Sequence, residues 1–171
     1  MKSRLRQIIG IMIAFILISQ NVISYAANKT QLKNEQSEID DKIKQLAQDM
    51  LDTMYKSDGI GLAACQVGML KRMIVYDIRY IEEDGKKEGH VLINPKITSR
   101  SKTMVEVEEG CLSFPDVYKN VLRHEKITVE YTDLDGKKKK INAKDMEAIV
   151  LQHEIDHLDG IVFLDRYEEQ N

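Results

Sequence analysis

Gln152-His153-Glu154-Ile155-Asp156-His157 lies in a segment, residues 142–158, that we predict to be a helix. Two histidines four residues apart on a helix project from the same face and can share one metal ion. Glu154 follows the first histidine, where its carboxylate can reach a water bound to that metal. The alternative is an exposed helix on which these residues occur by chance. The pattern favours a metal-binding helix around which the remaining elements pack.

The rest of the chain is predicted to be one helix followed mainly by strands. The helix begins at Glu38 with acidic residues that suit a helix N-terminus, and apolar residues recur at helical spacing as far as Met54. A small-residue loop should precede the strands, one strand should stop at Asn94-Pro95, and Asp135-Gly136 should turn the last hairpin. The predicted strands are 73–76, 91–93, 104–109, 127–132 and 138–141. Because they follow one another directly, we predict an α+β fold, with antiparallel strands and hairpins packed around the C-terminal metal-binding helix.

Two histidines do not complete a catalytic metal site, which usually has three protein ligands and a water. Neither His nor Cys follows His157, although four acidic residues near the end of the helix offer oxygen: Asp159, Asp165, Glu168 and Glu169. Upstream, the segment Glu109-Gly110-Cys111-Leu112-Ser113 offers a thiolate, which is a strong ligand for zinc or ferrous iron. Taken alone, a cysteine such as Cys111 is more often a buried core thiol.

A third segment, Gly59-Ile60-Gly61-Leu62-Ala63-Ala64-Cys65-Gln66, contains small residues that allow the backbone to approach a ligand closely. Gln66 offers an amide donor at its end. No Gly-Lys-Ser/Thr follows, so the segment is not a phosphate-binding loop. A simple tight turn is the alternative interpretation.

Together the three segments resemble, in order and spacing, the signature segments of the peptide deformylase family. The resemblance covers roughly residues 32–166. It implies that Cys111, His153 and His157 are the metal ligands and that Glu154 is the general base and acid. Gln66 and the backbone N–H of Leu112 match the donors to the oxyanion. The family's substrate-binding positions, including the pocket for the methionine side chain, correspond to Ile60, Gly61, Val107, Met146, Ile149 and Val150.

The resemblance implies a metal-dependent hydrolase that removes the formyl group from the N-terminal formyl-methionine of nascent proteins, as part of translation and N-terminal methionine processing. One divalent metal is implied, Fe²⁺ first, with Zn²⁺, Ni²⁺ or Co²⁺ able to occupy the same site. The implied partners are N-formylmethionyl peptides near the ribosome. We expect no direct contact with nucleic acid, because the net charge is −3, and we interpret the lysines of 137–140 as a solvated hairpin turn.

The N-terminal region differs from the rest of the chain. Residues 1–27 combine basic residues, an apolar run of eleven residues from Ile8 to Ile18 and small residues before Ala27, which is typical of a signal peptide or a membrane anchor. Residues 28–37 are polar and are interpreted as a linker, and residues 38–171 as the catalytic domain. We expect a cytoplasmic catalytic domain, associated with the membrane if residues 1–27 anchor it, while export through residues 1–27 is the alternative.

The sequence departs from the family pattern at two places. Cys65 stands where proline is common, and an oxidising compartment would allow Cys65 to pair with Cys111. The family's N-terminal Asp-Pro-x-Leu-Arg-like segment is reduced to Leu32-Lys33. Two other functions therefore stay open: a zinc endopeptidase, and a degenerate, non-catalytic metal-binding relative.

Overall fold

The computed structural model describes residues 41–82 and 86–170. The chain divides into two compact units, residues 1–42 and 43–171. Of the first unit only residues 41 and 42 are described, and they are helical. The segments predicted as signal or anchor (1–27) and linker (28–37), and the predicted helix start at Glu38, lie outside the described residues. In the described part of the chain, no helix has the length and apolar character needed to cross a membrane.

The second unit begins with a helix over residues 43–56, as its apolar spacing predicts. Ala47, Met50 and Met54 are buried and lie on one side, three or four residues apart. They pack against Met73 and Val75 of the sheet. The helix therefore forms one layer over the sheet.

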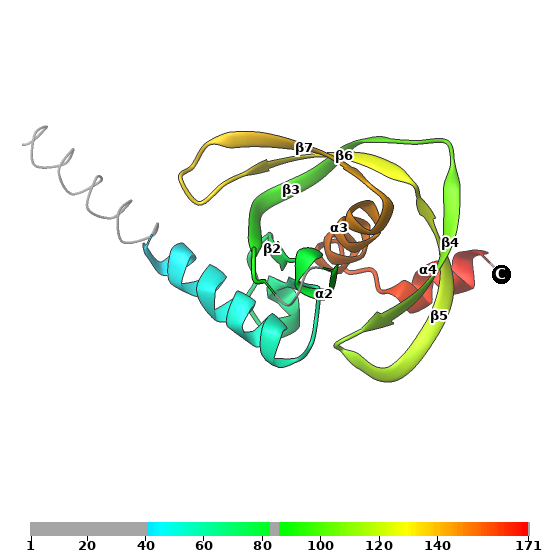
Figure 1. Ribbon diagram of the computed structural model, residues 1–171, viewed down its shortest axis with the longest axis horizontal. Coiled ribbons are helices and arrows are strands. Elements are labelled where there is room, and N and C mark those ends of the chain that lie inside the picture. Colours follow the sequence, from blue (N-terminus) through cyan, green and yellow to red (C-terminus); the bar gives the residue numbers. More distant parts are fainter. Residues whose placement is uncertain (1–40, 83–85, 171) are drawn as a thin grey trace, which may run out of the picture. The chain divides into compact units, whose positions relative to one another are not determined.

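Within the described residues, five antiparallel strands form the main sheet in the order β1-β2-β3-β6-β7, and two more form a separate hairpin, β4-β5 (Figure 1). Helix α3 lies against the main sheet on the side opposite the first helix, and its buried residues share a core with β2, β3, β6 and β7. The predicted α+β fold, with antiparallel strands around a C-terminal helix, is confirmed. The elements are β1 (Gly61–Ala63), a 3₁₀ helix (Ala64–Val67), β2 (Met73–Tyr76), α2 (Arg79–Glu82), β3 (His90–Arg100), β4 (Met104–Cys111), β5 (Phe114–His124), β6 (Lys126–Thr132), β7 (Lys138–Lys144), α3 (Asp145–Leu158) and α4 (Phe163–Gln170).

The prediction that a strand stops at Asn94-Pro95 is wrong, because β3 continues to Arg100. Asn94 adopts a φ of 52°, and the pairing register shifts between Ile93 and Lys96. Proline cannot donate a hydrogen bond to the ladder, and a bulge is the place where a strand tolerates it. The carbonyl of Pro95 instead accepts a hydrogen bond from Nε of Arg72 at 3.1 Å.

Three further boundaries differ from the sequence prediction. The predicted small-residue loop contains β1, because Gly61–Ala63 pair with Ile74–Tyr76. Helix α3 starts at Asp145 rather than at residue 142, since Asn142 and Ala143 still pair with β6. Strand β5 was not predicted, because exposed residues interrupt its apolar alternation.

Candidate metal centre and substrate pocket

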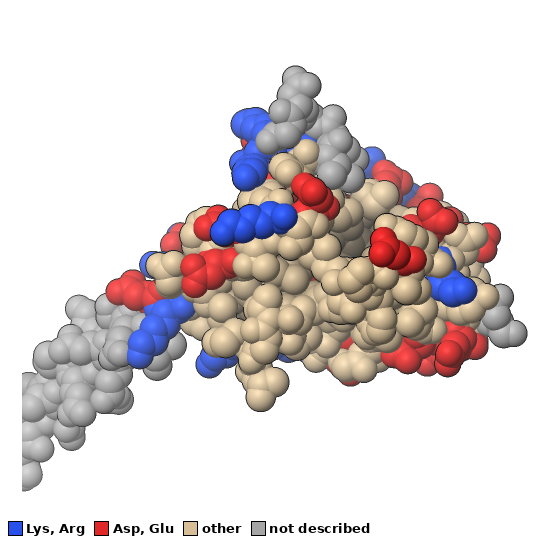
Figure 2. All heavy atoms as spheres, turned by 90° about the horizontal axis from the view of Figure 1, so that it is seen from below, with Lys and Arg blue, Asp and Glu red and all other residues tan. Residues whose placement is uncertain are grey.

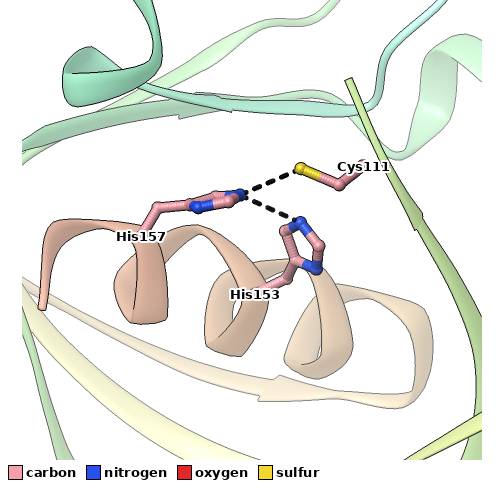
Figure 3. Close-up of side chains that lie close together, drawn as sticks. All are labelled: Cys111, His153 and His157. Carbon is pink, nitrogen blue, oxygen red and sulfur yellow. Dashed lines mark hydrogen bonds between the residues drawn. The ribbon is translucent and has the colours of Figure 1, made fainter. Parts of the chain in front are cut away.

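The last residue of β4 and one face of α3 bring a thiol and two imidazoles together (Figure 3). Nε2 of His157 lies 3.2 Å from Sγ of Cys111 and 3.2 Å from Nε2 of His153. All three potential ligand atoms lie within 4.8 Å of one another. Helix periodicity places the histidines on one face, whereas the fold brings Cys111 to them from 42 residues earlier in the chain.

These side chains fit a tetrahedral metal ion. Bonds of about 2.0–2.3 Å from a metal to imidazole nitrogen and thiolate sulfur separate the ligand atoms by roughly 3.3–3.6 Å. The two 3.2 Å separations are close to that spacing. A thiolate with two imidazoles suits zinc or ferrous iron, and three protein ligands leave a fourth position free for water or substrate.

The protonation of this group favours the ligand form of the cysteine. Burial alone would raise the pKa of the Cys111 thiol, but hydrogen bonds from the two histidines lower it to about 5. Burial would lower the pKa of His153, but hydrogen bonds to Cys111 and Glu109 raise it to about 10. The two shifts stabilise a thiolate beside an imidazolium, and metal binding would displace the imidazolium proton.

A buried carboxylate orients the first histidine. Nδ1 of His153 donates a hydrogen bond to Oε2 of Glu109 at 2.8 Å, which leaves Nε2 facing Cys111 and His157. Glu109 also accepts two hydrogen bonds from Arg123, at 2.6 and 2.9 Å. Burial would raise the pKa of Glu109, but Arg123 and His153 hold it below its usual range. A carboxylate on the second ring nitrogen is the usual way in which proteins fix a ligating histidine.

The same network continues to the C-terminal helix. Arg123 also contacts Asp156, which accepts two hydrogen bonds from Arg166 of α4, at 2.8 and 3.0 Å. Arg123 and Asp156 are buried, and each charge has an opposite partner. The network therefore ties β4, β5, α3 and α4 together directly behind the two histidines.

Glu154 is the most unusual carboxylate in the described part of the chain. It is buried, and its Oε2 has no hydrogen-bond partner among the described residues. Burial raises its pKa to about 7, against the opposing effect of His153 and His157. A buried polar atom without a partner is rare in folded proteins and calls for an explanation. A carboxyl group that titrates near neutrality can both accept and donate a proton there.

Gly61 makes room for this carboxyl group. A Cβ atom at Gly61 would lie within 2.4 Å of Oε1 and 2.8 Å of Cδ of Glu154. Such contacts are far below van der Waals separation, so any other residue at position 61 would force Glu154 to move. Strand β1 thus passes Glu154 as closely as a backbone can.

Gln66 reaches the thiol from the 3₁₀ helix. Its Nε2 lies 3.6 Å from Sγ of Cys111 and donates to Oγ of Ser113 at 3.0 Å. Its Oε1 accepts a hydrogen bond from the N–H of Ala63 at 2.8 Å, which fixes the amide. Leu112 follows Cys111 directly, and its side chain is partly exposed at 39%. Gln66 and Leu112 therefore both border the metal centre.

A pocket of about 570 Å³ opens beside Cys111, His153 and Glu154. Both sheets contribute to its wall, together with the first turns of α3. His157 does not line it. All the residues that the sequence singled out for substrate contact and for the oxyanion do line it: Ile60, Gly61, Gln66, Val107, Leu112, Met146, Ile149 and Val150.

The charged residues behind the histidines have little signal in the sequence. Glu109 and Asp156 lie inside the segments 109–113 and 152–157, where an acidic residue within two positions of a candidate ligand is the only signal. Arg123 and Arg166 carry no signal at all, because nothing in a single sequence distinguishes them from surface arginines. The free thiol of Cys65 donates to the carbonyl of His157 at 3.3 Å, and Cys65 and Cys111 are not joined.

Comparison with known proteins identifies the family. The polypeptide deformylase family model matches residues 16–171. A peptide deformylase of Prochlorococcus marinus (strain NATL2A) is 51% identical over 132 residues, which are 77% of this chain and 64% of that protein. Peptide deformylase 2 of Gloeobacter violaceus is 49% identical, over 78% of this chain and 71% of that protein. The chain thus spans slightly less than two thirds of the length of the first of these relatives.

Solved structures agree with the sequence relatives. A Synechococcus elongatus peptide deformylase in complex with actinonin has a TM-score of 0.71 and 44% identity, over 75% of this chain and 69% of that one. A probable peptide deformylase from Synechococcus phage S-SSM7 has a TM-score of 0.70 and 46% identity, over 75% of this chain and 85% of that one. On the sequence match and on this fold, the chain belongs to the polypeptide deformylase family.

Proposed function

We propose that this protein hydrolyses the formyl group from the N-terminal formyl-methionine of peptides and nascent chains. The observation that carries the proposal is the position of Glu154. Its buried and unpartnered carboxyl oxygen lies beside a Cys-His-His group and faces a pocket with apolar walls. An acid–base group next to a metal centre, with an apolar pocket for a side chain, suits amide hydrolysis.

Cys111, His153 and His157 would hold one divalent metal ion. Bound there, the ion would supply a Lewis acid and lower the pKa of a coordinated water. The family resemblance favours Fe²⁺, and the same donors accept Zn²⁺, Ni²⁺ or Co²⁺. Glu109 would keep Nε2 of His153 directed at the ion through its hydrogen bond to Nδ1.

The remaining residues act on the formyl group. Water attacks the formyl carbon and Glu154 accepts its proton, then the C–N bond breaks as Glu154 returns the proton to the leaving amine. The products are formate and a free N-terminal amine. Gln66 Nε2 and the N–H of Leu112 would donate to the developing oxyanion, where losing one donor typically costs ~10²–10³ in rate.

Six positions would bind the rest of the substrate. Gly61 borders the peptide backbone, and the apolar residues receive the methionine side chain. All six already line the pocket of about 570 Å³, a size that small-molecule and peptide sites commonly have. The proposed set is Ile60, Gly61, Val107, Met146, Ile149 and Val150.

The proposed setting is N-terminal methionine processing during translation, with formyl-peptides at the ribosome as substrates. We propose that residues 38–171 act as a cytoplasmic catalytic domain and that residues 1–27 are a signal-like or anchoring segment, joined by the linker 28–37. A reporter fused to residues 1–30 tests the location by cell fractionation. Recovery of a cleaved reporter outside the membrane would contradict the cytoplasmic placement.

The activity is tested by incubating the full chain, loaded with Fe²⁺ under anaerobic conditions, with formyl-Met-Ala-Ser. Formate release is the readout, and acetyl-Met-Ala-Ser is the substrate control. We expect formate from the wild type and from Cys65→Ser, and at least 100-fold less from Glu154→Gln, since general acid–base catalysis contributes ~10²–10⁴. Equal rates for Glu154→Gln and wild type would refute the role of Glu154.

The same assay separates the alternatives. A zinc endopeptidase would cleave internal peptide bonds and would keep that activity in Cys111→Ala. Such an enzyme also leaves the approach of Cys111 to within 3.2 Å of His157 unexplained. A non-catalytic relative would bind one metal ion and release no formate.

A further inference from the structure

Five lysines share one face of the main sheet. Side chains alternate along a strand, and residues directly opposite each other point to the same side. In β6 and β7 the inward set, which includes Ile127, Val129 and Ala143, packs in the core with α3. The residues that alternate with this inward set therefore point outward. The first of them are Lys126 on β6 and its partner Lys144 on β7.

The strand register identifies the other members of this face. Thr128 is opposite Asn142, Glu130 is opposite Lys140, and Thr132 is opposite Lys138, while Lys96 of β3 is opposite Glu130 on its other side. Two side-chain hydrogen bonds agree with this arrangement: Thr128 to Asn142 at 3.1 Å and Lys138 to Thr132 at 3.0 Å. We call this surface the lysine face, defined by Lys96, Lys126, Lys138, Lys140 and Lys144.

No described element covers the lysine face. The helix over residues 43–56 packs on the same side of the sheet, but against β1, β2 and the start of β3. Figure 1 shows α3 on the inner side of β6 and β7, with none of the described residues on their outer side. All five lysines are exposed.

The charge on this face is strongly one-sided. Glu130 is the only carboxylate on the four pairs of β6 and β7. Two carboxylates lie at one edge, each 3.8 Å from an exposed lysine: the half-buried Glu125 near Lys126 and the exposed Asp145 near Lys144. Exposed pairs at that distance stabilise little, so they leave both lysines able to bind another anion.

The rest of the molecule carries the opposite charge, because the whole chain has a net charge of −3. Figure 2 views the protein from below Figure 1, opposite β6 and β7, and acidic side chains gather there toward the end where α4 lies. A polarised molecule of this kind orients a polyanion toward its basic face.

We propose that the lysine face binds the phosphate backbone of double-stranded RNA. Along β7, Lys138 and Lys140 are separated by about 7 Å, and the face extends about 20 Å to Lys144. A duplex presents one phosphate charge per roughly 1.7 Å of its axis, so several phosphates meet the face at once. Thr128 and Asn142 lie between the lysines and can hydrogen-bond 2′-hydroxyl groups of the shallow RNA minor groove.

Strand register changes the expectation drawn from composition. Neither the net charge nor the lysine run 137–140 indicated binding to nucleic acid. A sequence shows only which lysines are neighbours along the chain, not which lysines share a surface. The sheet adds Lys96 and Lys126 from two other strands to the same surface. An anionic membrane is a poorer partner, because firm binding to a membrane surface usually adds burial of apolar side chains to charge attraction. Among the described residues, the large exposed apolar side chains lie elsewhere: Val67, Met69, Leu70, Met104, Leu112, Tyr118 and Leu122.

The test is fluorescence anisotropy of a labelled 16-base-pair RNA duplex titrated with the metal-loaded full chain. The first variant is Lys138→Gln/Lys140→Gln/Lys144→Gln. The control, Lys44→Gln/Lys56→Gln/Lys71→Gln, removes the same charge from exposed positions outside the face. We expect at least a 10-fold loss of affinity in the first variant and less than a twofold loss in the control.

Salt dependence and a gain of affinity sharpen the test. The magnitude of the slope of log affinity against log salt should fall by about 2.7 in the first variant, because it removes three lysines and each phosphate contact contributes ~0.9. Glu130→Gln, which removes the opposing carboxylate, should bind the duplex more tightly than wild type. Activity on a short formyl-peptide should stay unchanged in every variant, which shows that the fold is intact.

Three outcomes would overturn the proposal. The first is an equal loss of affinity in both triple variants, which would mean that only net charge matters. The second is tighter binding to a DNA duplex of the same sequence. The third is lysine-dependent binding to phosphatidylglycerol vesicles without binding to RNA.

Discussion

Nδ1 of His153 lies 2.8 Å from Oε2 of Glu109, and both side chains are buried. The carboxylate therefore fixes the orientation of the ring before any metal binds. Arg123 holds Glu109 in turn through two hydrogen bonds. The orientation of a metal-facing nitrogen thus depends on an ion pair formed between two strands of the hairpin, β4 and β5.

Replacing this carboxylate should weaken metal binding. Glu109→Gln keeps the shape of the side chain but removes its charge, and we expect about 10–100-fold lower metal affinity. Glu106→Gln, an exposed change on the same strand, is the matched control and should leave affinity unchanged. Competition with a chromophoric chelator measures both. Equal affinities in the two variants would show that Glu109 does not act on the metal centre.

A side chain at position 61 should displace Glu154, the proposed general base. The Cβ atom of Gly61→Ala would meet Oε1 of Glu154 at 2.4 Å, so we expect formate release to fall at least 10-fold while one metal ion is retained. The fall follows because a displacement near 1 Å at a reacting group can cost ~10² in rate. Metal analysis and a formate assay on the same sample provide the check. Loss of the metal ion together with activity would count against this explanation.

The stability of the metal-free protein should depend on the ionisation of Glu154. Its pKa is raised from 4.5 to about 7 by burial, so between these values the folded state binds more protons than the unfolded state. Its contribution to stability is present below pH 4.5 and is lost as pH rises to 7. Glu154→Gln should therefore be more stable than wild type at pH 8, by on the order of 3 kcal/mol, and similar to it at pH 4.5.

Urea unfolding of both metal-free proteins at the two pH values measures this difference. The relevant quantity is the difference between the proteins, because groups far from Glu154 titrate equally in both. A variant that is less stable than wild type at pH 8 would contradict the raised pKa.

The contribution of Asp156 to stability should depend on pH in the opposite direction to that of Glu154. Burial would raise its pKa, but hydrogen bonds from Arg166 and Arg123 lower it below 3.8. Its stabilising effect is therefore present above about pH 4 and lost as the pH falls further. Asp156→Asn removes one of the two charge partners of the buried Arg123 and the buried partner of Arg166, and we expect a loss of about 3 kcal/mol at pH 7.

Asp159→Asn is the control for this change. Asp159 pairs with Arg72 at 2.6 Å, but both side chains are more than a third exposed, so its loss should cost less than about 1 kcal/mol. Chemical unfolding at pH 7 and pH 3 should show the Asp156→Asn deficit shrinking at the lower pH. A deficit that persists at pH 3 would mean that packing, not charge, is lost.

Local patterns predicted the elements that carry, or lead into, the proposed metal ligands. The i, i+4 spacing of His153 and His157 is a property of a helix and requires no tertiary information. The strand predicted over 104–109, which in the structure continues to Cys111, and the hairpin turn at Gly136 follow from alternation and turn residues in the same way. The helix boundary at Asp145 does not, because continued pairing with β6 decides it.

The charged network behind the site could not be predicted from one sequence. Arg123 reaches Glu109 because two strands pair, and Arg166 reaches Asp156 because α4 folds back towards α3. Neither relation leaves a local pattern. The outward lysines are a similar case, since only the register brings Lys96 onto the same surface as Lys140. Contacts between segments that lie far apart in the chain are therefore what a single sequence does not predict.

X-ray absorption at the metal edge of the zinc-loaded full chain tests the central claim most directly. We predict one sulfur at about 2.3 Å and two imidazole nitrogens at about 2.0–2.1 Å, with the sulfur absent in Cys111→Ser. A first coordination shell without sulfur in the wild type, or an identical shell in Cys111→Ser, would contradict the assignment of Cys111, His153 and His157 to one ion.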